Sequence, residues 1–242
     1  MKNIKEKIKK IVPLFILKFI CKLIIYPLKK HYRKSYAQCG EDVILDVIFN
    51  STLKGVYVDV GANHPINSNN TYLFYNKGWK GINIDAMPGS MKLFNKYRKR
   101  DINLEFPIND VDKTMNYYMY KQNSYNSFIE NSTEYLQHLL IGTKQLQTKK
   151  LSWILDTYLS STNIDFLTVD VEGMDFNVLK SNNWEKYRPK VVLFESLVYE
   201  NNKEGLNYIN NYLQEKGYSK FCCTPTNVFY IEKTFLKQRF NN

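Results

Sequence analysis

The residue types and spacing of one short segment, residues 59–65 (DVGANHP), are suited to binding a small ligand. The segment directly follows an apolar run, so we expect it at the carboxyl end of a buried strand. Gly61 permits a tight turn and a close approach of the backbone to a ligand. The segment lacks the Gly-x-Gly-x-x-Gly pattern that places a pyrophosphate at a helix start. Asp59 instead suits a ligand with a cationic amine, although such glycine turns also occur in α/β proteins without a ligand.

A second candidate is Asp85, which ends the next predicted strand 24 residues after Gly61. A carboxylate at this place can accept hydrogen bonds from both hydroxyls of a ribose. Nicotinamide-dependent enzymes use the same device, so Asp85 by itself indicates only a nucleoside. The alternative interpretation is an acid that stabilises the start of a helix.

The third candidate is residues 170–175 (DVEGMD), which end a later apolar strand. Asp170 and Glu172 lie on the same side if the strand continues that far, and acids there could act as bases, orient a substrate or bind a metal. The sequence identifies no third ligand, so we predict no metal site. Asp175 is expected to cap the helix that follows. His64 could contact a substrate or accept a proton, and it could equally be a loop histidine without chemistry.

The elements that must position these residues alternate between short β-branched runs and helical patterns, which is typical of an α/β fold with a mostly parallel sheet covered on both faces. The pattern predicts helices over Glu41–Asn50, Thr71–Lys77, Ser90–Arg100, Leu151–Leu159 and Asn201–Lys216. It predicts strands over Gly55–Val60, Gly81–Asp85, Asn103–Ile108, Lys113–Tyr120, Ile164–Val171 and Lys190–Glu195, and a final pair within Lys220–Glu232. Residues 121–149 are poorly patterned, and we expect a mobile loop with one or two helical turns.

The net charge of +11 is concentrated at the N-terminus. Residues 1–34 contain eleven Lys and Arg against one acid, a net charge of +10, which leaves +1 for residues 35–242. A nucleic-acid-binding domain would carry its positive charge on the folded surface, so we predict no nucleic-acid partner. Residues 1–34 are instead expected to form a basic amphipathic segment that either lies on an anionic membrane surface or packs on the domain.

At these residues the chain resembles the FkbM family of S-adenosylmethionine-dependent methyltransferases. Five ordered motifs carry the resemblance, and they lie at residues 35–42, 58–65, 68–72, 78–88 and 168–175. The resemblance implies a Rossmann-like class I methyltransferase fold with a seven-stranded sheet over residues 35–242. It also implies S-adenosyl-L-methionine as the cofactor.

The same resemblance assigns roles to individual positions. Asp59, Gly61 and Asn63 would line the methionine end of the cofactor, and Asp85 would bind its ribose. Asn109 and Asp110, after the third strand, would lie near the adenine.

The resemblance also implies that Asp170 and Glu172 face the reacting methyl group or the acceptor. As the general base for methyl transfer we rank Glu172 first, Asp170 second and His64 third.

We expect O-methylation of a sugar hydroxyl in a surface polysaccharide or glycolipid precursor, because the basic N-terminal segment suggests work at a membrane. The enzyme would then be cytoplasmic and peripheral on the inner face of the membrane. A small polyketide-like metabolite is the alternative acceptor. Two other classes remain open, namely a cofactor-binding module without catalysis and a nicotinamide-dependent oxidoreductase, although the latter would require the missing glycine fingerprint.

Overall fold

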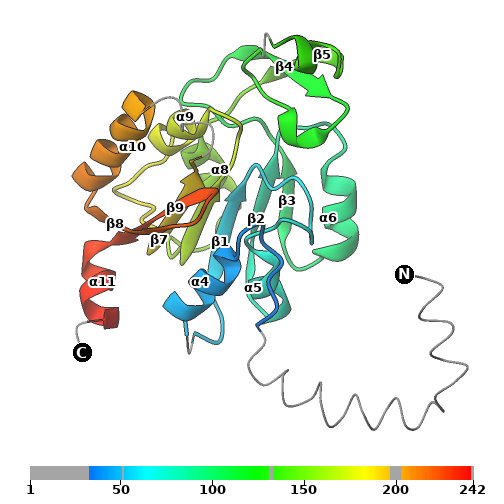
Figure 1. The fold of residues 1–242 in the computed structure, drawn as a ribbon. Coiled ribbons are helices and arrows are strands. Elements are labelled where there is room, and N and C mark those ends of the chain that lie inside the picture. The colour runs from blue at the N-terminus through cyan, green and yellow to red at the C-terminus, as the bar shows by residue number, and fades with distance from the viewer. Residues whose placement is uncertain (1–32, 51, 131–132, 197–202, 241–242) are drawn as a thin grey trace, which may run out of the picture. The chain divides into compact units, whose positions relative to one another are not determined.

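The computed structural model describes residues 33–50, 52–130, 133–196 and 203–240. Residues Tyr36–Asn242 form one compact unit around a seven-stranded sheet with the strand order β3-β2-β1-β6-β7-β9-β8 (Figure 1). The prediction for residues 1–34 falls almost wholly outside the described residues. Within the described part, no helix is both long and apolar enough to cross a bilayer.

The sheet is parallel except at β9, which pairs antiparallel with both β7 and β8. This arrangement confirms the predicted seven-stranded, mostly parallel sheet. Its strands are β1 (Val56–Val60), β2 (Lys80–Asp85), β3 (Ile102–Glu105), β6 (Phe166–Val169), β7 (Val191–Glu195), β8 (Tyr218–Cys223) and β9 (Asn227–Glu232).

Helices cover both faces of the sheet, as the apolar runs of the central strands require. One face packs against α8 (Leu151–Tyr158), α9 (Asp175–Lys180) and α10 (Lys203–Glu215). The other packs against α4 (Glu41–Ile48), α5 (Tyr72–Asn76) and α11 (Lys233–Phe240). The remaining long helix, α6 (Met91–Tyr97), contacts β3. Successive side chains of a strand point to opposite faces of the sheet. Val58 and Val60 therefore pack with α8, α9 and α10, whereas Tyr57 packs with α4, α5 and α11.

The strand register brings the ends of four strands together at one edge. Val60 pairs with Ile84 of β2 and with Val169 of β6, and Val169 pairs with Phe194 of β7. The residues that directly follow these paired positions are therefore also neighbours across adjacent strands. This register places Gly61, Asp85, Asp170 and Glu195 side by side at the carboxyl edge. The chain order reverses between β1 and β6, and ligands bind at such a switch point in open α/β sheets.

The structure differs from the sequence-based expectation in residues 121–149. This segment contains η2 (Asn123–Tyr125), α7 (Glu134–Gln137) and an eight-residue strand, β5 (Leu140–Gln147). β5 pairs antiparallel with β4 (Thr114–Tyr120) as a separate two-stranded sheet beyond the carboxyl edge of the main sheet (Figure 1). The prediction of a loop was wrong because most β5 side chains are exposed or only half-buried, so the strand shows no apolar alternation.

Candidate active site

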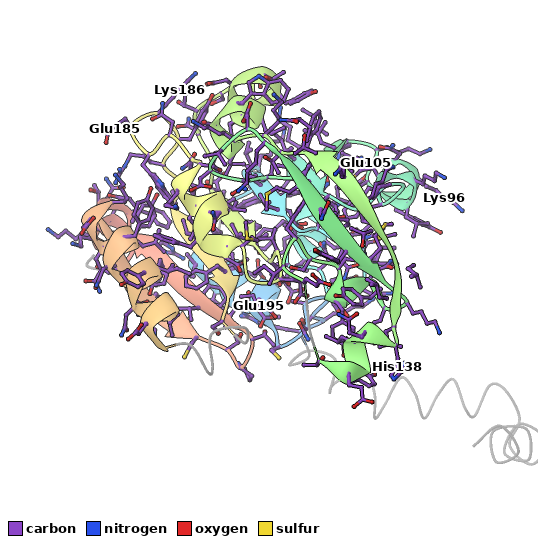
Figure 2. The ribbon with its side chains drawn as sticks, turned by 90° about the horizontal axis from the view of Figure 1, so that it is seen from above. Lys96, Glu105, His138, Glu185, Lys186 and Glu195 are labelled. Carbon is purple, nitrogen blue, oxygen red and sulfur yellow. The ribbon has the colours of Figure 1, made fainter. Side chains whose placement is uncertain are left out.

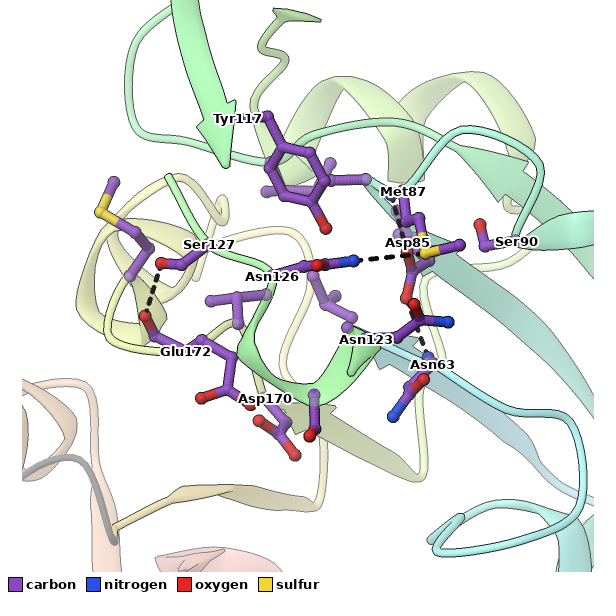
Figure 3. A pocket seen from close by; sticks show the side chains of 18 of the residues that line it. Asn63, Asp85, Met87, Ser90, Tyr117, Asn123, Asn126, Ser127, Asp170 and Glu172 are labelled. Atoms are coloured by element: carbon purple, nitrogen blue, oxygen red, sulfur yellow. Dashed lines mark hydrogen bonds between the residues drawn. The ribbon is translucent and has the colours of Figure 1, made fainter. Parts of the chain in front are cut away.

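A cavity of about 210 Å³ opens at the carboxyl edge, between the ends of β1, β2 and β6 and the segment 123–128 (Figure 3). Asn63 and Asp85 lie on one side of the cavity, and Asp170 and Glu172 lie on the other. Tyr117 and Phe128 also line it, so aromatic rings from outside the main sheet border the polar site.

The Asp85 carboxylate is held in place by two backbone N–H groups. Its Oδ2 accepts a hydrogen bond from the Asn63 N–H at 2.9 Å, and its Oδ1 accepts one from the Met87 N–H at 2.8 Å. Asn63 adopts a left-handed conformation with φ of 49°, which asparagine tolerates better than most residues. Each carboxylate oxygen keeps a free lone pair for a ribose hydroxyl. The predicted ribose-binding role is therefore compatible with the geometry.

Apolar side chains, among them Leu93, Phe106 and Ile108, also line the cavity. A flat heterocycle such as adenine fits such a lining. Asn109 and Asp110, which were expected there, do not line this cavity. Asn109 is buried, with its side-chain amide directed at the Met115 sulfur, and Asp110 forms an ion pair with Lys180 at 2.6 Å.

Asp59 also lies off the cavity, against the expectation that it lines the methionine end. Strand alternation turns its side chain to the same face as Tyr57, and it is 6% exposed. Its Oδ2 accepts hydrogen bonds from the Asn69 side-chain amide at 3.2 Å and from the Thr71 hydroxyl at 3.1 Å. Burial raises the pKa of Asp59 to about 6, although the nearby Arg98 charge opposes this shift.

Arg98 is the centre of a buried polar network behind the loop that follows β1. Its guanidinium pairs with Asp101 at 2.8 Å and donates to the Pro65 carbonyl at 3.0 Å and to the Asn69 side chain at 3.2 Å. Asn69 in turn donates to Asp59. The Arg98 network therefore stabilises the loop that begins at Asn63. Asp59 belongs to this network and does not line the cavity.

Gly61 is required by close packing at the carboxyl edge. Its φ is +84°, and a Cβ atom there would lie 1.6 Å from the Asp170 carbonyl oxygen. The close approach predicted for this glycine is thus an approach of the β1 and β6 backbones to each other. Gly61 still lines the cavity, as predicted.

Three acids cluster at the opposite wall, of which Asp170 and Glu172 line the cavity. Asp170, Glu172 and Glu195 each present a carboxylate oxygen, and these atoms lie within 4.8 Å of one another. Glu172 adopts a left-handed φ of 52°, which is costly for a non-glycine residue and is typical of functional sites. Its carbonyl accepts a hydrogen bond from the Ser127 hydroxyl at 3.0 Å (Figure 3). Burial and then the charges of the neighbouring acids raise the pKa of Glu172 to about 9 and that of Glu195 to about 7, and they raise the pKa of Asp170 well above its usual range.

Asp175 lies behind this wall. It is the first residue of α9, with Met174 at the N-cap position, so the predicted capping role was wrong. The Asp175 carboxylate instead points back along the chain and accepts a weak hydrogen bond from the Val171 N–H at 3.4 Å. Burial and the charge of Asp170 raise its pKa to about 7.

His64 lines the cavity, but one of its ring nitrogens is already engaged. Nδ1 accepts hydrogen bonds from the Ile66 N–H at 3.1 Å and from the Asn67 N–H at 3.0 Å. An imidazole that accepts at Nδ1 carries its proton on Nε2 when neutral, so the remaining nitrogen is a donor. This geometry supports the last place of His64 among the candidate bases.

Sequence reasoning missed Glu195 and the contribution of the segment 123–128. Glu195 ends an apolar strand, which is the same signal that identified Asp85 and Asp170. Seen from above, it lies towards the interior, whereas Lys96 and Lys186 lie at the periphery (Figure 2). Asn126 and Ser127 carry no such signal, because they come from the poorly patterned region. They bridge the two walls, since Asn126 directs its amide at the Met87 sulfur at 3.3 Å and Ser127 donates to Glu172.

The strand order, with one antiparallel strand inserted before the last, differs from the all-parallel order of dinucleotide-binding folds. Together with the acid that ends β2 and the turn after β1, it is the arrangement of a class I S-adenosylmethionine-dependent methyltransferase. The sequence profile of the Methyltransferase FkbM domain matches residues 59–220, which is more than half of the chain. The chain therefore belongs to the FkbM methyltransferase family.

Other comparisons concern more distant proteins. No curated protein matches the sequence. A solved TehB-like SAM-dependent methyltransferase from Corynebacterium glutamicum is similar, with 10% identity and a TM-score of 0.43 over 92% of this chain and 100% of that one. A precorrin-6y C5,15-methyltransferase from Geobacter metallireducens is also similar, with 8% identity and a TM-score of 0.40 over 78% of this chain and 85% of that one.

Proposed function

We propose that the protein is an O-methyltransferase that acts on a hydroxyl of a sugar in a surface polysaccharide or glycolipid precursor. The observation that carries this proposal is the polarity of the wall opposite Asp85. Asp170, Glu172 and Ser127 line the cavity there, and Asn123 lines it nearer to Asp85 (Figure 3). A polyhydroxylated acceptor can donate to the carboxylates and pair with the amide and hydroxyl groups. An apolar polyketide-like acceptor would leave these groups unpaired, which costs binding energy.

The protein's contribution to the reaction is alignment, exclusion of water and removal of a proton. S-adenosylmethionine supplies an electrophilic methyl group. When the acceptor oxygen forms its bond to this methyl group and the carbon–sulfur bond breaks, the hydroxyl proton must leave. Glu172 is the first candidate to accept this proton and Asp170 the second, because both face the cavity. Positive charge that enters the cavity with the cofactor opposes the raised pKa of Glu172 and so favours its ionised form.

The N-terminal charge supports the choice of acceptor. Residues 1–34 carry +10, and a basic amphipathic segment is attracted to an anionic leaflet. We place the enzyme in the cytoplasm, on the inner face of the membrane, where it meets a lipid-linked sugar.

The direct test is transfer of a labelled methyl group by the full-length protein. Labelled S-adenosylmethionine is incubated with lipid-linked oligosaccharides, with nucleotide sugars and with small polyketide-like alcohols in separate reactions. Label in an O-methyl sugar is expected. Label only in the apolar alcohols would establish the alternative acceptor, and saturable cofactor binding without transfer to any pool would indicate a non-catalytic module.

The base is tested by Glu172→Gln in the same assay. We expect kcat to fall by about 10²- to 10⁴-fold, the usual contribution of a general base, with little change in cofactor affinity. Full turnover in this variant would exclude Glu172 as the base.

A further inference from the structure

The ends of β6 and β7 bring acidic side chains together that are distant in the sequence. Val169 pairs with Phe194, so Asp170 and Glu195 are the next residues on two adjacent parallel strands. Neighbouring strands lie about 4.8 Å apart, which places the two carboxyl groups within reach of each other. The left-handed backbone conformation of Glu172 turns the chain back, and its carboxyl group lies beside the other two. The three acids converge because of backbone geometry.

The resulting arrangement has the dimensions of a cation site. One oxygen from each of Asp170, Glu172 and Glu195 lies within 4.8 Å of the others, which is the spacing of ligands around one ion. All three residues are half-buried, and Asp170 and Glu172 also line the cavity. The open side leaves positions for water or for acceptor hydroxyls to complete the coordination.

Two buried oxygen atoms near the cluster lack hydrogen-bond donors. Asp175 is fully buried, and its Oδ2 has no donor, although its charge acts on both Glu172 and Glu195. Oε2 of Glu195 is likewise shielded from solvent without a donor. In the described part of the chain, no Lys, Arg or His side chain forms an ion pair with any of these four acids. A buried carboxylate without compensation is costly, so this wall has the charge of a site that receives a cation.

We infer that Asp170, Glu172 and Glu195 bind a hard divalent cation, with Asp175 as a buried charge behind them. The donors are carboxylate oxygens without His or Cys, which favours magnesium, manganese or calcium over zinc or copper. This inference goes beyond the proposed function, since the site is defined by the protein alone and not by the acceptor. A cation here would lie on the acceptor wall of the cavity, within reach of hydroxyl groups bound there.

The test is binding of Mn²⁺ to the full-length protein. Binding is measured as the loss of the electron paramagnetic resonance signal of free Mn²⁺. Saturable binding is expected, with competition by Mg²⁺. Glu195→Gln should weaken Mn²⁺ binding by about tenfold or more, because it removes one charged ligand. The matched control is Glu185→Gln, the same change at an exposed acid away from the cavity, and it should leave binding unchanged.

Thermal unfolding provides a second readout that separates loss of a ligand from loss of the fold. Without metal, Glu195→Gln should melt at or above the temperature of the native protein, because one of several repelling carboxylates is gone. Added Mn²⁺ should raise the melting temperature of the native protein and of Glu185→Gln equally, and that of Glu195→Gln by clearly less at the same Mn²⁺ concentration. Absence of Mn²⁺ binding to the native protein, with and without S-adenosylhomocysteine, would overturn the inference, as would unchanged binding in Glu195→Gln. Neither measurement uses turnover, so a failure of the cation site can be distinguished from a failure of the proposed methyl transfer.

Discussion

At the scale of single residues, Asp85 is the proposed contact to the cofactor ribose, whereas Asp110 is an acid outside the cavity. Asp85 lines the cavity and is oriented by two backbone N–H groups, whereas Asp110 is paired with Lys180 away from it. Asp85→Ala removes charge-assisted hydrogen bonds to the ribose, and we expect S-adenosylhomocysteine to bind about 10- to 100-fold more weakly. Calorimetric titration of the full-length variants measures this change.

Asp110→Ala is the control for this experiment. It should leave the affinity for S-adenosylhomocysteine unchanged, because the side chain does not reach the cavity. A loss of affinity in Asp110→Ala similar to that in Asp85→Ala would contradict the placement of the adenine beside Phe106 and Ile108.

Asp59 predicts a pH dependence of stability. Its pKa in the folded protein is about 6, above its value of about 3.9 in an unfolded chain. The folded state therefore holds the proton more tightly, so the contribution of Asp59 to stability is present below pH 4 and is lost as the pH rises to 6. The charged groups that act on it are Arg98, Asp85 and Asp170. The loss amounts to about 3 kcal/mol for a difference of two pKa units.

The comparison with Asp59→Asn isolates this contribution, because asparagine can still accept a hydrogen bond at the same place. Urea unfolding at pH 4, 5, 6 and 7 gives the free energy of unfolding of both proteins. The native value minus the variant value should fall with rising pH and level off above 6. A difference that is constant or rises over this range would show that Asp59 is not buried as described.

At the scale of elements, the segment 123–128 forms one side of the cavity. It lines the cavity and contacts both walls, through Asn126 to Met87 and through Ser127 to Glu172. It is held to β4 by the pair of backbone hydrogen bonds between Tyr118 and Ser127. A bound ligand adds contacts to this segment and should slow its opening.

We therefore expect S-adenosylhomocysteine to slow amide hydrogen exchange in residues 123–128 by about tenfold or more. Mass spectrometry of peptic peptides measures this change. The internal control is β8, at the far edge of the sheet from β3, where exchange should stay the same. Equal slowing in β8 would indicate general stabilisation, and no slowing in residues 123–128 would show that the segment does not close on the cofactor.

At the scale of the whole molecule, charge is divided unequally between residues 1–34, with +10, and residues 35–242, with +1. Each basic residue near an anionic surface contributes about 1 kcal/mol of attraction, which salt weakens. The full-length protein should therefore sediment with vesicles rich in phosphatidylglycerol at low salt, and less so at high salt. The fragment 35–242 should not sediment with these vesicles, and neither protein should sediment with phosphatidylcholine vesicles. Equal binding by the fragment would place the membrane-binding surface elsewhere.

The sequence by itself determined the sheet and the acids that end its strands. Short β-branched runs separated by amphipathic segments predict a parallel sheet, and Asp85 and Asp170 follow such runs directly. Carboxyl ends of parallel strands share one edge, so these acids could be placed near a common cavity before the structure was known. The apolar runs are local signals. They predict the strands reliably because a strand that is buried on both faces must carry apolar side chains.

Only the tertiary structure decided which polar side chains meet in the cavity. Asp59 and Asp85 both lie on strands in the apolar pattern, but alternation and the Arg98 network turn Asp59 away. Glu195 joins Asp170 because of the register between β6 and β7, which depends on packing across the whole sheet. Asn126 and Ser127 reach the site from the segment between β4 and β5, which has no apolar period. Contacts between residues far apart in the chain follow from register and packing, and no local pattern encodes them.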